Sequence, residues 1–365
     1  MRDAAASERE SPVTPLPIFD GHNDTLAALY RRGLSFFEEH AQGHLDLPRA
    51  QRGGLIGGIY AIFPPAPPDS PESDPLYGLQ MTEEGYALAP NSPVEPGYAR
   101  AFTDAVLKLL DTWEQAPGEP VRVVRTYEDL HANRDAGRHS LVLHFEDAAA
   151  IEADLSNLEA YYQRGLRSLG LVWSRPNAFG CGVPFRYPHS PDTGPGLTPA
   201  GKQLVRACNR LGIQIDLAHL NERGFWDAAA LTTAPLVVSH AGVHALCAST
   251  RNLTDAQIDS VGQSNGVIGV IFEPGNLRRD GRPGVATPLM GIVEHIDYIA
   301  QHIGVEHVAF GSDFDGADMP QDLPDVASLP RLIAALHDRG FDQTALEKIA
   351  YRNWFRVLQA AWRSS

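Results

Sequence analysis

Cysteine is scarce in this chain of 365 residues, and the three present, Cys181, Cys208 and Cys247, lie far apart with no CxxC spacing. A sparse, odd number of cysteines argues against a disulfide framework and against a thiolate zinc site. Positive charge is also low, with 30 Lys and Arg against 45 Asp and Glu and a net charge of −15. Nucleic-acid and anionic-membrane surfaces need clustered Lys and Arg, so neither partner is expected, whereas a small-molecule site that holds cations remains compatible.

Long hydrophobic runs are missing as well. No uninterrupted apolar run reaches the roughly 18 residues of a membrane span. The first fifteen residues, MRDAAASERESPVTP, contain no apolar signal-peptide core, and the end, AAWRSS, is not the hydrophobic tail of a lipid-anchored form. The sequence therefore predicts a cytoplasmic protein without a membrane segment, with a flexible tail over residues 1–15 and a single catalytic domain over residues 16–365.

What the sequence does contain is a series of short apolar runs with the character of β-strands. Several are hydrophobic at almost every position, which is typical of strands buried on both faces. We expect eight strands, at residues 18–21, 54–63, 140–146, 166–173, 212–219, 235–240, 266–273 and 307–314.

Amphipathic helical patterns separate these strands. The helix expected at 198–212 has Thr198 as its N-cap, Pro199 at its first position and Gly212 just past its end, and the one at 287–304 repeats the pattern with Thr287, Pro288 and Gly304. Further helices are expected at 98–115, 155–165, 254–264, 329–340 and 344–362.

Strand followed by helix, repeated eight times, predicts an α/β fold of the (β/α)8 TIM-type barrel class, with an open doubly wound sheet as the alternative. Two loop insertions, at about residues 64–97 and 181–197, follow predicted strands two and four. In a barrel, such strand-to-helix loops enclose the active face, although the first could equally be a mobile surface insertion.

Polar residues stand at the carboxyl ends of these apolar runs, and in a closed barrel those ends converge on one face. Taken singly, each has a plainer explanation, such as a capping histidine, a helix N-terminal carboxylate or a turn-forming aspartate. Taken together, three imidazoles and three carboxylates fit a site for divalent transition metals. The residues are His22, Asp24, Glu146, His219, His240 and Asp313.

Five ligands exceed the three that a single hydrolytic zinc needs, but they suit two ions if one carboxylate bridges them. The simplest partition gives one ion to His22, Asp24 and Glu146, and the other to Glu146, His219 and His240. A hydroxide held between the ions would be the nucleophile.

The remaining histidines are expected to play smaller parts. His144 would lie on the same side of its strand as Glu146 and support it, and His244 is a weaker candidate ligand. Solvated positions are expected for His44, His131, His139, His189, His302 and His337.

The motifs that carry these residues resemble the membrane dipeptidase (renal dipeptidase) family, peptidase family M19, over residues 16–360. The resemblance rests on DGHND at 20–24, LDLPRAQRGGLIGG at 45–58, the glutamate of HFED, IDLAH at 215–219, VVSHAGVHAL at 237–246, STRNLTD at 249–255 and GSDFDG at 311–316. It implies a metallo-dependent hydrolase-like barrel with two Zn²⁺ ions that hydrolyses dipeptides, including L-Xaa-D-Xaa. Dimers are common in this family, so a homodimer is one option.

The resemblance also implies roles for single residues. His22 and Asp24 would bind one zinc, His219 and His240 the other, and Glu146 would bridge them. Asp313 would be the catalytic acid/base, a task that suits a carboxylate beside metals. Three substrate-binding residues are expected in addition, namely Arg251, Trp173 and Glu273.

Each of these substrate residues has its own chemistry. Arg251 would grip the substrate's terminal carboxylate through its planar guanidinium, or else be a surface arginine that starts a turn. Trp173 replaces a histidine of mammalian relatives and offers one N–H donor and a large apolar face. Glu273 would meet a substrate amino group or a cationic side chain, or be a solvated loop residue.

Two other functions remain open on the sequence alone. One is a binuclear metal hydrolase of N-acyl-D-amino acids or related amides on the same barrel. The other is a non-catalytic metal-binding or ligand-sensing protein.

Overall fold

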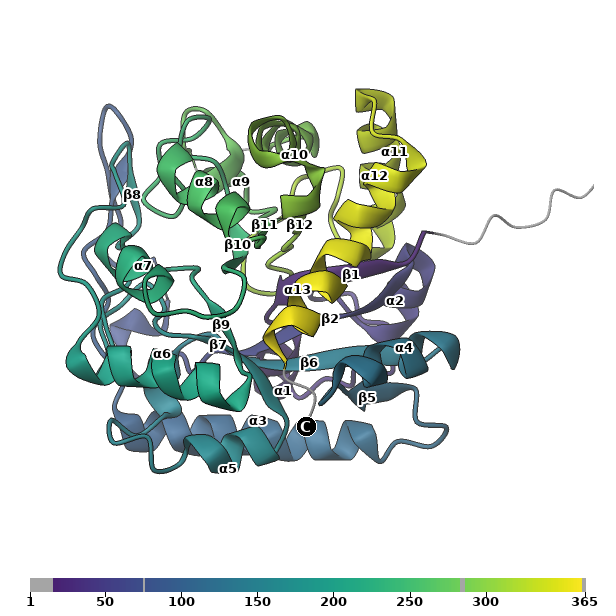
Figure 1. Ribbon diagram of the computed structural model, residues 1–365, viewed down its shortest axis with the longest axis horizontal. Coiled ribbons are helices and arrows are strands. Elements are labelled where there is room, and N and C mark those ends of the chain that lie inside the picture. Colours follow the sequence, from purple (N-terminus) through teal and green to yellow (C-terminus); the bar gives the residue numbers. More distant parts are fainter. Residues whose placement is uncertain (1–15, 75, 283–285, 363–365) are drawn as a thin grey trace, which may run out of the picture.

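The computed structural model describes residues 16–74, 76–282 and 286–362, so the predicted tail at 1–15 lies outside the described residues. Eight parallel strands form the centre of the molecule, with helices around them (Figure 1). Their spatial order follows the chain: β1 (Ile18–Asn23), β2 (Leu55–Ile62), β6 (His139–Phe145), β7 (Leu166–Gly170), β9 (Gln214–Asp216), β10 (Val237–Ala241), β11 (Val267–Val270) and β12 (Val308–Phe310).

The first and last strands come together and nearly close the sheet. The backbone N–H of Asp313 donates to the carbonyl of His22 at 3.0 Å, and the N–H of Asp24 donates to the carbonyl of Phe314 at 2.8 Å. The predicted (β/α)8 barrel is therefore confirmed, and the open doubly wound sheet is wrong.

All eight predicted strands are present, though most are shorter than their apolar runs. Their residues are almost all buried, because one face fills the barrel interior and the other packs on helices. The main helices are α1 (Thr25–Arg32), α2 (Leu47–Gly53), α3 (Pro96–Glu114), α4 (Tyr127–Asp135), α5 (Leu158–Gln163), α6 (Pro199–Leu211), α7 (Glu222–Ala229), α8 (Asp255–Gln263), α9 (Pro274–Leu277), α10 (Met290–Ile303), α11 (Leu329–Arg339), α12 (Gln343–Glu347) and α13 (Asn353–Ala361).

The two helices predicted from Thr-Pro starts behave differently. At α6 the Thr198 side chain accepts from the Gly201 N–H, and Gly212 ends the helix in the left-handed conformation, as expected. The predicted start of the other helix at Thr287 is wrong, because α10 begins at Met290 without a side-chain cap bond. The helix predicted at 344–362 is present as an unbroken helical run over residues 343–361, in which a π-helical segment, Lys348–Arg352, joins α12 to α13.

Helix α13 crosses the barrel strands in Figure 1 and packs on inward-facing side chains of the strands. Trp354 is fully buried there, and its indole N–H donates to the carbonyl of Phe310 at 2.9 Å. A Cβ atom at Gly21 would lie 2.0 Å from the Trp354 ring. Glycine is therefore required beside His22, because any side chain would push α13 away from β1.

The loop insertions contain short strands that the sequence did not reveal. Strands β3 (Gln80–Met81), β4 (Tyr86–Ala87) and β8 (Arg186–Tyr187) form a small antiparallel sheet that joins the two insertions. Another unpredicted strand, β5 (Val121–Val123), pairs with the start of β6. Among the described residues, none of the helices has both the length and the apolar character needed to cross a bilayer.

Candidate active site

A cavity of about 570 Å³ lies at the carboxyl ends of the barrel strands. Its wall includes seven of the nine predicted site residues, all except His22 and His240, as well as side chains of both insertions, among them Tyr86 and Phe185. The insertions therefore enclose the face at which the strand ends converge, as the sequence predicted for loops of a barrel.

Glu146 lies at the centre of a group of imidazoles. Its Oε1 atom is 3.0 Å from His219 Nε2, 3.6 Å from His240 Nε2 and 3.6 Å from His22 Nε2. The two histidines His219 and His240 are themselves close, with their Nε2 atoms 3.0 Å apart. Three predicted imidazole ligands, from β1, β10 and the segment after β9, thus meet at one carboxylate oxygen.

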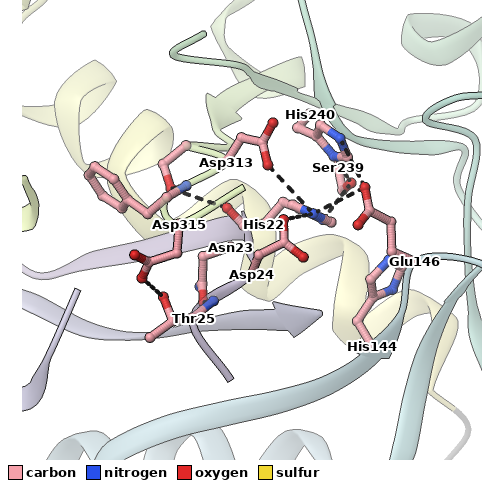
Figure 2. Close-up of polar contacts among 12 residues, drawn as sticks. His22, Asn23, Asp24, Thr25, His144, Glu146, Ser239, His240, Asp313 and Asp315 are labelled. Carbon is pink, nitrogen blue, oxygen red and sulfur yellow. Dashed lines mark hydrogen bonds and ion pairs between the residues drawn. The ribbon is translucent and has the colours of Figure 1, made fainter. Parts of the chain in front are cut away.

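The other two predicted carboxylates approach His22 (Figure 2). Its Nε2 atom lies 3.7 Å from Asp24 Oδ2 and 4.0 Å from Asp313 Oδ1. Three sets of three residues have ligand atoms close enough to share a cation: His22 with Glu146 and His240, His22 with Asp24 and Asp313, and His22 with His144 and Asp216. The structure therefore brings together all six residues that the sequence placed at the strand ends.

The backbone around these residues departs from the predicted strands. The predicted strands at 212–219 and 307–314 included His219 and Asp313, but each residue lies three positions beyond the end of its observed strand, β9 or β12. Both adopt positive φ angles, 64° and 62°, a conformation that is uncommon for residues other than glycine. Such turns aim the two side chains across the barrel mouth, and strain of this kind concentrates at functional sites.

The hydrogen bonds of the cluster fit a metal centre. His219 and His240 have their Nδ1 atoms 2.8 Å from the hydroxyls of Ser174 and Ser239, which leaves the Nε2 atoms directed at Glu146. His22 Nε2 and Asp24 Oδ1 are buried without a hydrogen-bond partner among the described residues. Buried polar atoms normally have partners, and a bound cation would satisfy both, so the residues present fit divalent metal ions.

The electrostatics of the cluster agree with that fit. Burial lowers the pKa values of His219 and His240 well below the usual range, assisted by the Arg251 charge, so both are neutral and can act as ligands. Burial raises the pKa of Glu146 well above its usual range, and the neighbouring Asp24 raises it further. For His22 burial lowers the pKa, but the surrounding carboxylates, Glu146 first, outweigh it and raise the pKa to about 10.

Excess negative charge also affects Asp313. Burial, reinforced by Asp24, raises the pKa of Asp313 to about 7. A carboxyl group with a pKa near neutrality can both accept and donate a proton at physiological pH. This is the property that the predicted acid/base role requires.

Arg251 stands in the loop after β10 and is buried against the cluster. Its Nη2 atom is 3.1 Å from His219 Nε2 and 3.3 Å from the carbonyl oxygen of His240. It lines the cavity, and it forms no ion pair with a carboxylate among the residues described. A buried guanidinium without an anionic partner is suited to bind one from a ligand.

Trp173 and Glu273 both line the cavity. The Trp173 ring lies 4.8 Å from the ring of Phe63 and 5.6 Å from that of Phe185, which gives one side of the cavity an aromatic wall. Glu273 caps α9, where its carboxylate accepts from the N–H groups of Gly275 and Asn276 at 2.8 Å. It is therefore a fixed helix cap at the cavity wall and not a solvated loop residue.

The other histidines were placed less well from the sequence. His139 was expected to be solvated, which is wrong, because it lies in β6, is buried and has its Nε2 atom 2.6 Å from the Tyr60 hydroxyl. His44 lines the cavity, and its Nδ1 atom accepts from the Asp315 N–H at 2.9 Å. His244 Nε2 contacts the carbonyl of His189 instead of the cluster.

Two supporting residues, Ser174 and Ser239, were missed. Serine is not a common metal ligand, so its residue type gave no signal. Only the position of Ser239 directly before His240 could have drawn attention to that serine. His144 is fully buried beside the cluster, with its ring centroid 5.5 Å from that of His22, in agreement with the predicted supporting position.

A (β/α)8 barrel whose strand ends surround a cavity with clustered histidines and carboxylates defines the class of metal-dependent hydrolases. The sequence profile of the membrane dipeptidase family (peptidase family M19) matches residues 8–364. This chain belongs to that family, whose members are metallodipeptidases.

Two individual relatives match this chain over most of its length. The chain is 46% identical over 243 residues to the "uncharacterized protein in pqqA 5′ region" of Klebsiella pneumoniae, and the match covers 67% of this chain and 90% of that protein. It is 27% identical over 353 residues to the dipeptidase tcpJ of Claviceps purpurea, covering 93% and 76%.

One solved structure matches this chain over nearly its whole length. The crystal structure of a metallo peptidase from Rhodobacter sphaeroides, liganded with a phosphinate mimic of the dipeptide L-Ala-D-Ala, superposes with a TM-score of 0.90 at 41% identity. The match covers 95% of this chain and 100% of that chain.

Proposed function

We propose that this protein is a zinc-dependent dipeptidase that hydrolyses the peptide bond of dipeptides, including L-Xaa-D-Xaa. The observation that carries the proposal is the convergence of three imidazole Nε2 atoms within 3.6 Å of one Glu146 oxygen, at a cavity that also holds the buried Arg251. Membership of the metallodipeptidase family, and the L-Ala-D-Ala mimic bound by the Rhodobacter relative, support this choice of substrate.

Five residues would hold two metal ions. We assign His22, Asp24 and Glu146 to one ion and Glu146, His219 and His240 to the other, with Glu146 shared. When bound, such ions lower the pKa of water toward neutrality and polarise the scissile carbonyl. Nitrogen and oxygen ligands without thiolates suit zinc as well as other divalent transition metals.

The remaining site residues would select and orient the substrate. Arg251 would bind its terminal carboxylate, and because this guanidinium lies only 3.1 Å from His219 Nε2, only a short substrate places its peptide bond beside the histidines. Trp173 supplies an apolar wall for a substrate side chain. Glu273, whose oxygens already accept two backbone N–H bonds, can also attract a substrate amino group.

Asp313 would carry the proton. Its carboxyl oxygen lies 4.0 Å from His22 Nε2 at the cavity, beside the residues that would hold the metal ions. A carboxylate in that position could accept a proton from the attacking water and deliver it to the leaving amine. The Asp313→Asn variant keeps the shape and the hydrogen-bonding capacity but cannot accept a proton. We expect it to retain the zinc content of the wild type and to lose at least about 100-fold in kcat, in line with typical acid/base contributions.

The test of the proposed function is a substrate panel on the zinc-loaded protein, run beside a measurement of its metal content. The panel contains L,L dipeptides, L,D dipeptides, tripeptides and N-acyl-D-amino acids. Turnover of dipeptides with little turnover of tripeptides is expected. Turnover of only the N-acyl-D-amino acids would make the chain an amide hydrolase of another specificity, and zinc binding without any turnover would make it a non-catalytic metal-binding protein.

We further propose a homodimer as the working form. Sedimentation at concentrations spanning those of the activity assay tests this proposal, with a monomer at all concentrations as the contrary result.

A further inference from the structure

A buried pair, Asp216 and Ser239, lies behind the histidine cluster, on the side away from Glu146. Asp216 is the last residue of β9, and Ser239 precedes His240 in β10; both are about 1% exposed. The Ser239 hydroxyl oxygen is 2.5 Å from Asp216 Oδ2, 2.8 Å from His240 Nδ1 and 3.4 Å from His22 Nδ1. Figure 2 shows Ser239 beside the ring of His240.

The direction of these hydrogen bonds follows from counting protons. A carboxylate only accepts, so the single hydroxyl proton of Ser239 is donated to Asp216. The Ser239 oxygen then has lone pairs only for the two histidines, and each must carry its proton on Nδ1. The Nε2 atom of His240 is thereby left as a lone pair 3.6 Å from Glu146. The Nε2 atom of His22, also 3.6 Å from Glu146, is left as the nitrogen that would release its proton when a metal ion binds.

We propose that Asp216 and Ser239 form a positioning pair that sets the tautomer of a histidine ligand in each of the two metal sites at once. This inference rests on the proposed metal centre and adds residues to which the sequence assigned no role. In the two proposed metal sites neither residue is a ligand, and both would act through His22 and His240. One serine would thus adjust both ions together, which a separate partner for each histidine could not do.

A substitution at Asp216 tests the positioning pair directly, because backbone hydrogen bonds fix the orientation of its carboxylate. Its Oδ1 atom accepts the backbone N–H groups of Ser239 at 2.8 Å and of Ala218 at 3.1 Å. In an Asp216→Asn variant the amide oxygen must stay at these two donors, so the amide nitrogen takes the place beside the Ser239 hydroxyl. The nitrogen then donates to Ser239, and the Ser239 proton turns toward the histidines.

The reversed bond has a defined consequence. A Ser239 hydroxyl that donates to a histidine Nδ1 requires that nitrogen to be unprotonated, which moves the ring proton to Nε2. A protonated Nε2 cannot bind a metal ion. Ser239→Ala, in contrast, removes the acceptor without imposing the wrong tautomer, so it should weaken metal binding less than Asp216→Asn does.

The experiment measures zinc affinity and stoichiometry by competition with a chromophoric chelator, together with urea unfolding of the metal-free proteins. Ser239→Ala should lose about 10- to 100-fold in zinc affinity, which is the usual effect of losing such a supporting partner, and Asp216→Asn should lose more. The metal-free Asp216→Asn protein should unfold near the wild-type midpoint, because its hydrogen bonds are reversed but still made. Ser140→Ala is the matched control: this buried serine of β6 accepts from Asn133 at 3.2 Å, and its loss should leave zinc affinity unchanged.

Zinc binding by Asp216→Asn within about threefold of the wild type would overturn the positioning pair, as would a greater loss in Ser239→Ala than in Asp216→Asn. Failure of the wild-type chain itself to bind zinc would instead refute the proposed metal centre. The two failures are therefore distinguishable. Restoration of affinity in Ser239→Thr, which returns the hydroxyl, would add support.

Discussion

His295, a histidine outside the active site, makes the stability of this protein depend on pH. It lies in α10, fully buried, and its Nδ1 atom accepts the Val243 N–H at 2.9 Å. Its Nε2 atom lies 3.1 Å from the carbonyl oxygen of Leu277 and must carry the ring proton to donate to it. Protonation of Nδ1 would set two N–H donors against each other, so the folded protein requires the neutral ring.

The magnitude follows from the shift in pKa. Burial lowers the pKa of His295 to about 4 in the folded protein, against 6.5 for an unperturbed histidine. Because the folded pKa is depressed, this contribution to stability is complete above about pH 6.5 and is lost as the unfolded chain takes up a proton at lower pH. Between about pH 7.5 and pH 4.5 the loss amounts to about 2.5 kcal/mol from this one residue.

The assay is urea unfolding of the metal-free wild type and of His295→Gln at these two pH values. Glutamine can accept from Val243 and donate to Leu277 but does not titrate, so the variant should lose about 2.5 kcal/mol less than the wild type over this interval. His337→Gln, at an exposed histidine of α11, should show the wild-type pH dependence. Equal losses in wild type and His295→Gln would refute the reasoning.

Two other substitutions test the substrate anchor and the barrel. Arg251→Met should raise KM for dipeptides about 100-fold, since about 3 kcal/mol of charged hydrogen bonding to the terminal carboxylate is lost. The zinc content should stay unchanged. An unchanged KM would show that Arg251 does not bind the substrate. Gly21→Ala should yield little folded protein, or a strongly lowered thermal midpoint, because the added Cβ would lie 2.0 Å from the Trp354 ring. An unchanged thermal midpoint would show that the contact relaxes freely.

The barrel could be predicted from the sequence because its strands are buried on both faces and therefore almost continuously apolar. The strand limits could not, because buried apolar residues continue past the last strand residue, as at Leu217 and Ala218 after β9. The short strands β3, β4 and β8 were missed because most of their residues are too exposed to give an apolar run. Residues such as the exposed Met81 carry no periodic burial signal, since the pairing of the two insertions is decided by tertiary contacts.

The candidate site was predictable to the extent that its chemistry depends on residue type and on position at strand ends. His22, Asp24 and Glu146 stand directly at the ends of long strands, so their convergence follows from barrel geometry. The environment of each side chain was not predictable. The burial of His139 and the bonds of Ser239 depend on which neighbours the barrel brings together from distant segments.

The seam between β1 and β12 has a consequence for the newly made chain. Its contacts join residues 292 positions apart: the Ser312 N–H and hydroxyl donate to the two oxygens of Asp20, at 2.8 and 2.7 Å, directly beside His22. A ribosome-bound fragment that has not yet released this last strand can pair β1 with β2 but lacks the bonds that close the barrel beside His22. The cluster around His22 can therefore be completed only after nearly the whole barrel has left the ribosome.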